Sequence, residues 1–219
     1  ITPYVFKGQN RITVAVHDDV RENIPSGKQS KKPDSHGCFY TRSTGIWQTV
    51  WLERTPVNYI KSIKFYPQSD YKTVRVELLT EGCGMASIGV FLNGKRVGEA
   101  RGEVEYRHTF DIELSEIALW SVGEGNLYDV TATFGEDEVQ SYFGFRIATY
   151  QGRKFMLNGK SVFQRLVLDQ GYYADGIYTA KDAAQFAHDI ALSKALGFNG
   201  ARLHQKVFEQ RFLYECDKA

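Results

Sequence analysis

The clearest alternation of apolar and polar positions lies in residues 163–206. FQRLVLDQGYYADG contains an apolar run of strand length, TAKDAAQFAHDIALSKALG has helical periodicity, and FNGARLHQK contains a second short apolar run. Strands that alternate with helical segments predict βαβ units and a parallel sheet. The next stretch, VFEQRFLYECDKA, predicts a further helix. We therefore expect an α/β arrangement in the C-terminal part of the chain.

Side chains alternate between the two faces of a strand, so each apolar run has an apolar and a polar face. The apolar faces, which should meet the helices, hold Leu166, Leu168, Ala201 and Leu203. The polar faces hold Asp169, Arg202 and His204 at the carboxyl ends of the strands, where parallel α/β folds and barrels place their active sites. The pattern alone supports a buried Asp–Arg network without chemistry equally well.

The helix between the two strands has start and stop signals. Thr179 is the expected N-cap, and Asp182 would lie in the first turn, where the helix dipole favours negative charge. Gly197 is expected to end the helix after Leu196. Phe186 belongs to its predicted buried stripe.

Residues 56–148 predict a small β domain. Short alternating strands recur with regular turn signals, and Asn93-Gly94 is a strong two-residue hairpin signal because both positions accept positive φ. This pattern and the size of the segment favour an antiparallel sandwich of immunoglobulin-like dimensions. The paired cysteines and buried tryptophan of an antibody domain are not part of the pattern.

Residues 1–55 predict two strands, at 12–16 and 46–52, separated by a polar surface loop at 18–37. Trp47 and Trp51 share one face of the second strand. They could stack on a sugar, although burial at an interdomain surface is the commoner use of such residues.

Composition narrows the classes of function. A net charge of +1 gives no electrostatic footprint for nucleic acid or an anionic membrane, and no apolar run reaches transmembrane length. The cysteines are three in number and widely spaced, which indicates free thiols. No ligand spacing links the histidines, so we expect neither a metal nor another cofactor. The sequence indicates no compartment.

Motifs in three parts of the chain carry a resemblance. RSTGIWQTVWLE, then IALWSVGEGNLYDV with YFGFRIA, then LDQGYYADGIYTA with DIALSKALGFNGARLHQKVFEQRFLYECDK occur in that order. Together they resemble glycoside hydrolase family 2, which contains β-galactosidases, β-glucuronidases and β-mannosidases. The resemblance implies a multidomain, mainly β chain. Residues 1–55 would be the C-terminal part of a sugar-binding jelly-roll domain, 56–148 an immunoglobulin-like β-sandwich, and 149–219 the first two βα units of a (β/α)8 TIM barrel.

The resemblance also implies a retaining hydrolase of terminal β-linked sugars, with β-galactosidase as the first expectation and β-glucuronidase or β-mannosidase next. In the family both catalytic glutamates lie on later barrel strands, one of them in an Asn-Glu pair. No Asn-Glu dipeptide occurs in this chain, so we assign it no catalytic residue and expect the 219 residues alone to be inactive. The alternative is a non-catalytic carbohydrate-binding or structural β-sandwich module.

The expected partners are a carbohydrate substrate and the remainder of the same enzyme, with a homo-oligomer left open and nucleic acid and membranes excluded. Two βα units cannot close a barrel, because their edge strands stay unpaired. We therefore expect residues 163–206 either to be poorly ordered in isolation or to belong to a larger molecule.

The resemblance assigns five substrate-binding residues. Asp169 and Gln170 occupy the region where many members have a histidine that contacts the sugar, and Arg202 matches the arginine that ends the second strand. Many members read Arg-x-x-His-x-Pro there, whereas here His204 comes one position earlier and the proline is absent. Asp19, or its neighbour Asp18, would contact a sugar hydroxyl.

Overall fold

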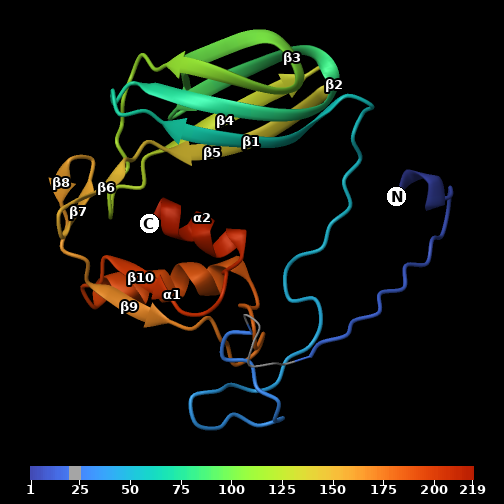
Figure 1. Cartoon of the computed structure of the whole chain (residues 1–219), viewed down its shortest axis with the longest axis vertical. Helices are drawn as coiled ribbons and strands as arrows, with labels where there is room; N and C mark the ends of the chain where they lie inside the picture. Colours follow the sequence, from blue (N-terminus) through green and yellow to red (C-terminus); the bar gives the residue numbers. More distant parts are fainter. Residues whose placement is uncertain (20–25) are drawn as a thin grey trace. The chain divides into compact units, whose positions relative to one another are not determined.

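The computed structural model of the chain describes residues 1–19 and 26–219. They form two compact units. Unit 1 contains residues 1–50, 168–181 and 203–209, and unit 2 contains residues 51–167, 182–202 and 210–219. Figure 1 shows the elements of both units. The polar loop predicted at 18–37 falls partly on residues 20–25, which lie outside the described residues.

The main element of unit 2 is an antiparallel five-stranded sheet that curls into two layers (Figure 1). Its strands are β1 (Tyr59–Pro67), β2 (Thr73–Leu92), β3 (Lys95–Glu113), β4 (Leu127–Phe134) and β5 (Asp137–Gly144). The first half of β2 pairs with β1 and with the end of β3. Its second half pairs with β4 and with the beginning of β3, and β4 pairs with β5. The long strands β2 and β3 therefore belong to both layers, as expected for a β-sandwich formed from one continuous sheet.

The bend between the layers has a local cause. The pairing of β2 with β3 shifts register between Leu79 and Cys83. Gly82 lies in this interval with φ 84°, a conformation that side chains other than glycine rarely adopt. A Cβ atom at Gly82 would lie 2.1 Å from Oδ1 of Asn58. Glycine thus allows both the backbone turn and the close approach of the preceding loop.

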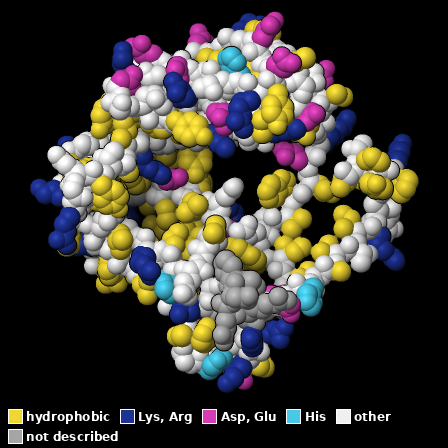
Figure 2. All heavy atoms as spheres, in the orientation of Figure 1, with side chains coloured by type: hydrophobic (Ala, Val, Ile, Leu, Met, Phe, Trp, Pro, Cys, Tyr) yellow, Lys and Arg dark blue, Asp and Glu magenta, His cyan; other side chains and the backbone are white. Residues whose placement is uncertain are grey.

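The core lies between the layers and consists of the inward-facing residues of the strands. The largest fully buried side chains of the sandwich include Val74, Val76, Leu78, Ile88, Val90, Ile112, Tyr128 and Phe134. Burying each large apolar side chain contributes about 1.5–3 kcal/mol. The hydroxyl of Tyr128 remains satisfied, because it accepts from the Ala118 amide at 2.7 Å and donates to the Glu116 carbonyl at 3.3 Å. The outer surface carries charges of both signs side by side (Figure 2).

The predicted hairpin turns are present. Asn93 and Gly94 connect β2 to β3 with φ values of 51° and 78°. The same two residue types recur at Asn158 and Gly159 in a small antiparallel sheet. That sheet consists of β6 (Ala148–Gln151), β7 (Lys154–Leu157) and β8 (Lys160–Ser161).

The C-terminal segment follows the predicted order of strand, helix, strand and helix. Its elements are β9 (Leu166–Asp169), α1 (Ala183–Ala195), β10 (Gly200–Leu203) and α2 (Gln210–Lys218), and β9 and β10 pair in a two-stranded sheet. The Asn199 amide donates to the Arg165 carbonyl at 3.0 Å, and the His204 amide donates to the Asp169 carbonyl at 2.8 Å. Residue numbers increase together at both ends, so the two strands are parallel. The described residues contain no further barrel strand, and a closed TIM barrel stays a prediction.

Two details of this segment differ from expectation. Asp182, not Thr179, is the N-cap of α1 and accepts from the Gln185 amide at 3.0 Å. The Thr179 hydroxyl is engaged elsewhere, because it donates to Oε1 of the buried Glu209 at 2.7 Å. The predicted end of the helix is correct, since Gly197 follows the C-cap with φ 87°.

The leucine face of β9 also differs from expectation. Leu166 and Leu168 are 40% and 52% exposed, so the described residues do not cover this face as predicted. The buried ring of α1, Phe186, packs against Phe212 of α2, with their centroids 5.5 Å apart. On β10 the prediction is better, since Ala201 is half-buried and Arg202 is exposed.

Helix α2 ends against the sandwich within unit 2. Asp217 accepts from Nη1 of Arg146 at 2.8 Å and from the hydroxyl of Tyr142 at 3.2 Å. Its backbone carbonyl accepts from Nε1 of Trp120 at 2.6 Å, and the guanidinium of Arg146 lies 4.5 Å from the centroid of that indole. One residue near the end of the chain therefore makes three hydrogen bonds to the sandwich and the residues just after it.

The strands predicted at 12–16 and 46–52 are not formed in the described residues, whose only regular element before residue 59 is a 3₁₀ turn at Thr2–Tyr4. An extended segment becomes a strand only when a neighbour satisfies its backbone donors and acceptors. No described segment pairs with these two, and most of their apolar side chains are exposed, including Ile12, Val14, Ile46 and Val50. The jelly-roll assignment of residues 1–55 stays a prediction. Neither helix in the described part of the chain has the length and apolar content needed to span a bilayer.

Candidate functional site

The carboxyl ends of β9 and β10 meet in unit 1, where Asp169 and His204 are joined by their backbone hydrogen bond. Oδ1 of Asp169 accepts from the Gly171 amide at 2.8 Å, which fixes the carboxylate against the loop that follows. Gln170 and the side chain of His204 are half-buried. The structure therefore brings three of the predicted substrate-binding residues, Asp169, Gln170 and His204, together at the ends of β9 and β10.

The other two predicted residues are placed differently. Arg202 is exposed and belongs to unit 2, so its role beside Asp169 stays a prediction. Asp19 is also exposed, and its carboxylate lies 3.5 Å from Nε2 of His17. The neighbouring Asp18 is better held, because its Oδ2 accepts from Nε2 of Gln29 at 2.9 Å and from the hydroxyl of Thr44 at 3.1 Å.

Sequence reasoning missed Lys206, which lies two residues beyond His204. Its half-buried side chain extends to the loop after β9, and Nζ donates to the backbone carbonyls of Gly171 and Tyr178. These carbonyls stand at the two ends of the 171–178 segment. A single ammonium group therefore bridges both ends of the loop that begins beside the predicted site.

Aromatic rings surround this ammonium. Nζ lies 4.2 Å from the ring centroid of Tyr178, 5.0 Å from that of Phe208, 5.3 Å from that of Trp47 and 5.6 Å from that of Tyr172. Each ring presents its negative face to a cation at distances where the attraction is appreciable. We call Lys206 with these four residues the lysine cage.

Burial determines the electrostatics of the lysine cage. Burial lowers the pKa of Lys206 to about 8, and the charges of Asp169 and Glu209 oppose this change without reversing it. Burial raises the pKa of Tyr172, whose hydroxyl has no hydrogen-bond partner among the described residues. Burial also raises the pKa of Tyr178, and the charge of Asp18 adds to that effect.

Asp169 gives this arrangement a hydrogen-bond acceptor of the kind that polar ligands use. The free oxygen of a carboxylate such as Asp169 can accept hydrogen bonds from hydroxyl groups. A retaining glycosidase uses two carboxyl groups about 5–5.5 Å apart, whereas the contact that fixes Asp169 is with the Gly171 amide. The residues described also contain no group of three or more metal-ligating side chains.

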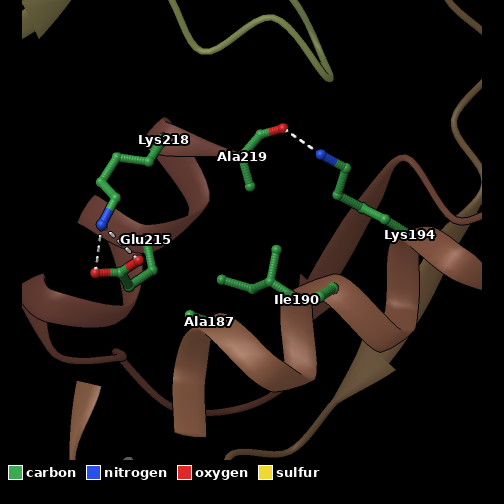
Figure 3. Close-up of a pocket in the computed structure, with 7 residues that line it drawn as sticks. Ala187, Ile190, Lys194, Glu215, Lys218 and Ala219 are labelled. Atoms are coloured by element: carbon green, nitrogen blue, oxygen red, sulfur yellow. Dashed lines mark hydrogen bonds and ion pairs between the residues drawn. The ribbon is translucent and has the colours of Figure 1, made fainter. Parts of the chain in front are cut away.

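An open hollow of about 400 Å³ lies between α1 and α2 and is a weaker candidate (Figure 3). Ala187, Ile190 and Ala191 supply its apolar wall. Its charged groups are already engaged, since Lys218 pairs with Glu215 at 2.9 Å and Nζ of Lys194 donates to the Ala219 carbonyl at 2.6 Å. Among the described residues that line the hollow, each charged side chain already has a partner.

The sandwich is the part of the chain that matches a known family. The sequence model of the glycosyl hydrolases family 2 matches residues 58–146, which contain all five strands of the curled sheet. The chain carries a domain of glycosyl hydrolases family 2. A β-galactosidase of Thermoanaerobacterium thermosulfurigenes is 28% identical to the chain over 227 aligned residues, which cover 97% of the chain and 31% of that enzyme.

Solved structures show the same fold. A glycosyl hydrolase family 2 member from Bacteroides cellulosilyticus DSM 14838 matches with a TM-score of 0.68 and 20% identity, over 75% of the chain and 26% of that protein. Bacteroides uniformis β-glucuronidase 3 matches with a TM-score of 0.65 and 22% identity, over 75% of the chain and 22% of that protein. The chain thus spans less than a third of the length of each of these relatives.

Proposed function

We propose that this family 2 chain is part of a retaining glycoside hydrolase that acts on terminal β-linked sugars, with β-galactosides as the preferred substrates. The observation that carries the proposal is the alignment of 97% of the chain with a β-galactosidase. The two catalytic glutamates would come from residues outside 1–219. β-Glucuronides and β-mannosides are the next candidates, and likeness of fold does not choose among these sugars.

Within this proposal, the residues of unit 1 bind the sugar rather than cleave it. Asp169 would accept a hydrogen bond from a sugar hydroxyl, with Gln170 and His204 beside it, and Arg202 and Asp19 would complete the contacts. A retaining glycosidase needs two carboxyl groups about 5–5.5 Å apart, one as nucleophile and one as acid/base. We assign Asp169 to neither role, because both roles belong to glutamates that we expect outside residues 1–219.

A panel of nitrophenyl glycosides tests the proposal on a polypeptide that extends beyond residue 219. We expect nitrophenyl β-galactoside to give the highest kcat/KM and the first product to keep the β configuration in NMR spectra. The matched control replaces the glutamate of the expected Asn-Glu pair by glutamine. Absence of hydrolysis for every glycoside in the panel would reject an enzyme in favour of a carbohydrate-binding module.

The chain of 219 residues by itself gives a complementary test. We expect it to release no nitrophenol from any of these glycosides, because neither glutamate is present. Measurable hydrolysis that scales with its concentration and persists through purification would contradict the placement of both catalytic groups outside this segment.

A further inference from the structure

We propose that Lys206 is a positioning residue of the sugar site, which ties together the two ends of loop 171–178 and thereby fixes the carboxylate of Asp169 for a substrate hydroxyl. This inference rests on the proposed function. It concerns a residue that neither the motifs nor the fold assigns.

The peptide groups of Gly171 are held from two directions. Its amide donates to Oδ1 of Asp169 at 2.8 Å, and its carbonyl accepts from Nζ of Lys206. Because the two contacts share one residue, a displacement of Gly171 on the lysine side also moves the donor that orients Asp169. Lys206 thus acts on the carboxylate through Gly171.

The loop itself is a closed unit. The Tyr173 amide donates to the Ile177 carbonyl at 2.9 Å, and the Ile177 amide donates to the Tyr173 carbonyl at 3.0 Å. These bonds close the middle of the loop, and Nζ of Lys206 joins the carbonyls of Gly171 and Tyr178 outside them. Hydrogen bonds from a charged donor are about twice as strong as neutral ones, so the ammonium makes a large contribution to this closure.

The lysine cage restricts where the ammonium can go. Its four rings occupy the space around Nζ, and a Cβ atom at Gly171 would lie 2.7 Å from Nζ and 2.7 Å from Cζ of Phe208. Glycine at this position lets the backbone approach the lysine closely. Because the fit is tight, Lys206 fixes the position of the Gly171 backbone in addition to contributing a positive charge.

Kinetics of the longer, active polypeptide test the inference. We expect Lys206→Met to raise KM for the preferred glycoside about tenfold, the effect of losing one charge-assisted hydrogen bond of about 1.5 kcal/mol, with kcat within about twofold. Lys160→Met is the matched control, because Lys160 is exposed on β8 in unit 2, and its KM should not change. In an Asp169→Ala background, Lys206→Met should have little further effect on KM. Equal, additive effects in both backgrounds would overturn the inference, because a general structural role does not depend on Asp169.

A second measurement works without activity and separates this inference from the proposed function. Hydrogen exchange of the Gly171 amide in the 219-residue chain should become at least about tenfold faster in Lys206→Met. Lys206→Gln, which keeps two N–H donors, should give an intermediate rate and serves if the methionine variant does not fold. Unchanged exchange would overturn the role of Lys206 even if the enzyme proves to be a β-galactosidase. Faster exchange in a protein that hydrolyses no glycoside would support the role of Lys206 in holding loop 171–178 and would reject the proposed function.

Discussion

At the scale of single residues, the most informative contacts join segments that are distant in the sequence. Adjacent parallel strands could be predicted from the order strand, helix, strand, and the structure pairs β9 with β10 and joins Asp169 to His204. Lys206 could not be predicted, because its carbonyl partners and Trp47 come from separate stretches of the chain. A lone lysine after a strand has no local signal of burial. The sequence gives one indication of a role for Lys206, which is that it continues the alternation of polar residues begun by Arg202 and His204.

The lowered pKa of Lys206 predicts how stability changes with pH. Between about pH 8 and its ordinary value of 10.5, the unfolded chain binds a proton that the folded chain has released. The contribution of Lys206 to the free energy of unfolding therefore rises with pH in this window. We expect urea unfolding between pH 7.5 and 9.5, below the titration of ordinary tyrosines, to show this rise in the native chain and not in Lys206→Met. A rise of equal size in both proteins would contradict the assignment.

Gly171 provides a prediction with a matched control. Its φ is 64° and an added Cβ would meet Lys206 and Phe208, whereas Gly37 has φ 54° and nothing within 4 Å. Both alanine variants carry the left-handed backbone cost of about 1–2 kcal/mol, and Gly171→Ala adds overpacking of about 1–3 kcal/mol. Denaturant unfolding should therefore show a larger loss for Gly171→Ala than for Gly37→Ala. Equal losses would mean that the crowding at Gly171 relaxes freely.

At the scale of elements, local signals predicted the turns and the helix end well. Asn93-Gly94 forms its hairpin and Gly197 ends α1, because positive φ is a property of the residue itself. The N-cap was predicted three residues too early, since the choice between Thr179 and Asp182 depends on a partner of Thr179 that is distant in sequence. The strands at 12–16 and 46–52 failed for a related reason, because alternation specifies a strand only where a neighbour exists to pair with it.

The N-cap of α1 can be tested directly. Asp182→Ala should lower the free energy of unfolding by about 1 kcal/mol, because the Gln185 amide loses its acceptor. Asp182→Asn keeps an acceptor at the same place and should lower the free energy of unfolding by only a few tenths of 1 kcal/mol. Hydrogen exchange in the first turn of α1 locates the effect. A larger loss in the asparagine variant than in the alanine variant would contradict the capping geometry.

At the scale of the whole molecule, the sequence predicted the β-sandwich but not the contact between helix α2 and the sandwich. An antiparallel β-sandwich was predictable from the repeated alternation in residues 56–148, and the structure shows one formed from a single curled sheet. The attachment of α2 to the sandwich could not be predicted, because Asp217 reads in the sequence as one more charge on a polar helix face. Its partners Trp120, Tyr142 and Arg146 lie more than seventy positions earlier.

The attachment at Asp217 gives a prediction at this scale. Asp217→Ala removes the acceptor of Arg146 and Tyr142, and hydrogen bonds to charged groups contribute about 1.5–3 kcal/mol. We expect an unfolding loss of about that size. Asp111→Ala, which breaks the more exposed pair with Arg75, should cost clearly less, because solvent screens that pair. The same change at Asp217 should bring the pKa of Tyr142, which burial and Asp217 raise to about 12, back toward its ordinary value. An unchanged tyrosine titration would contradict the contact.

The passage of β2 and β3 through both layers of the sandwich has a mechanical consequence. A conventional sandwich can in principle lose one sheet while the other persists, because separate strands build each. Here any force or denaturant that opens one layer pulls on strands that also belong to the other. This domain should therefore melt in a single cooperative step, and under tension applied across the β2–β3 hairpin it should give way as one event rather than as a series.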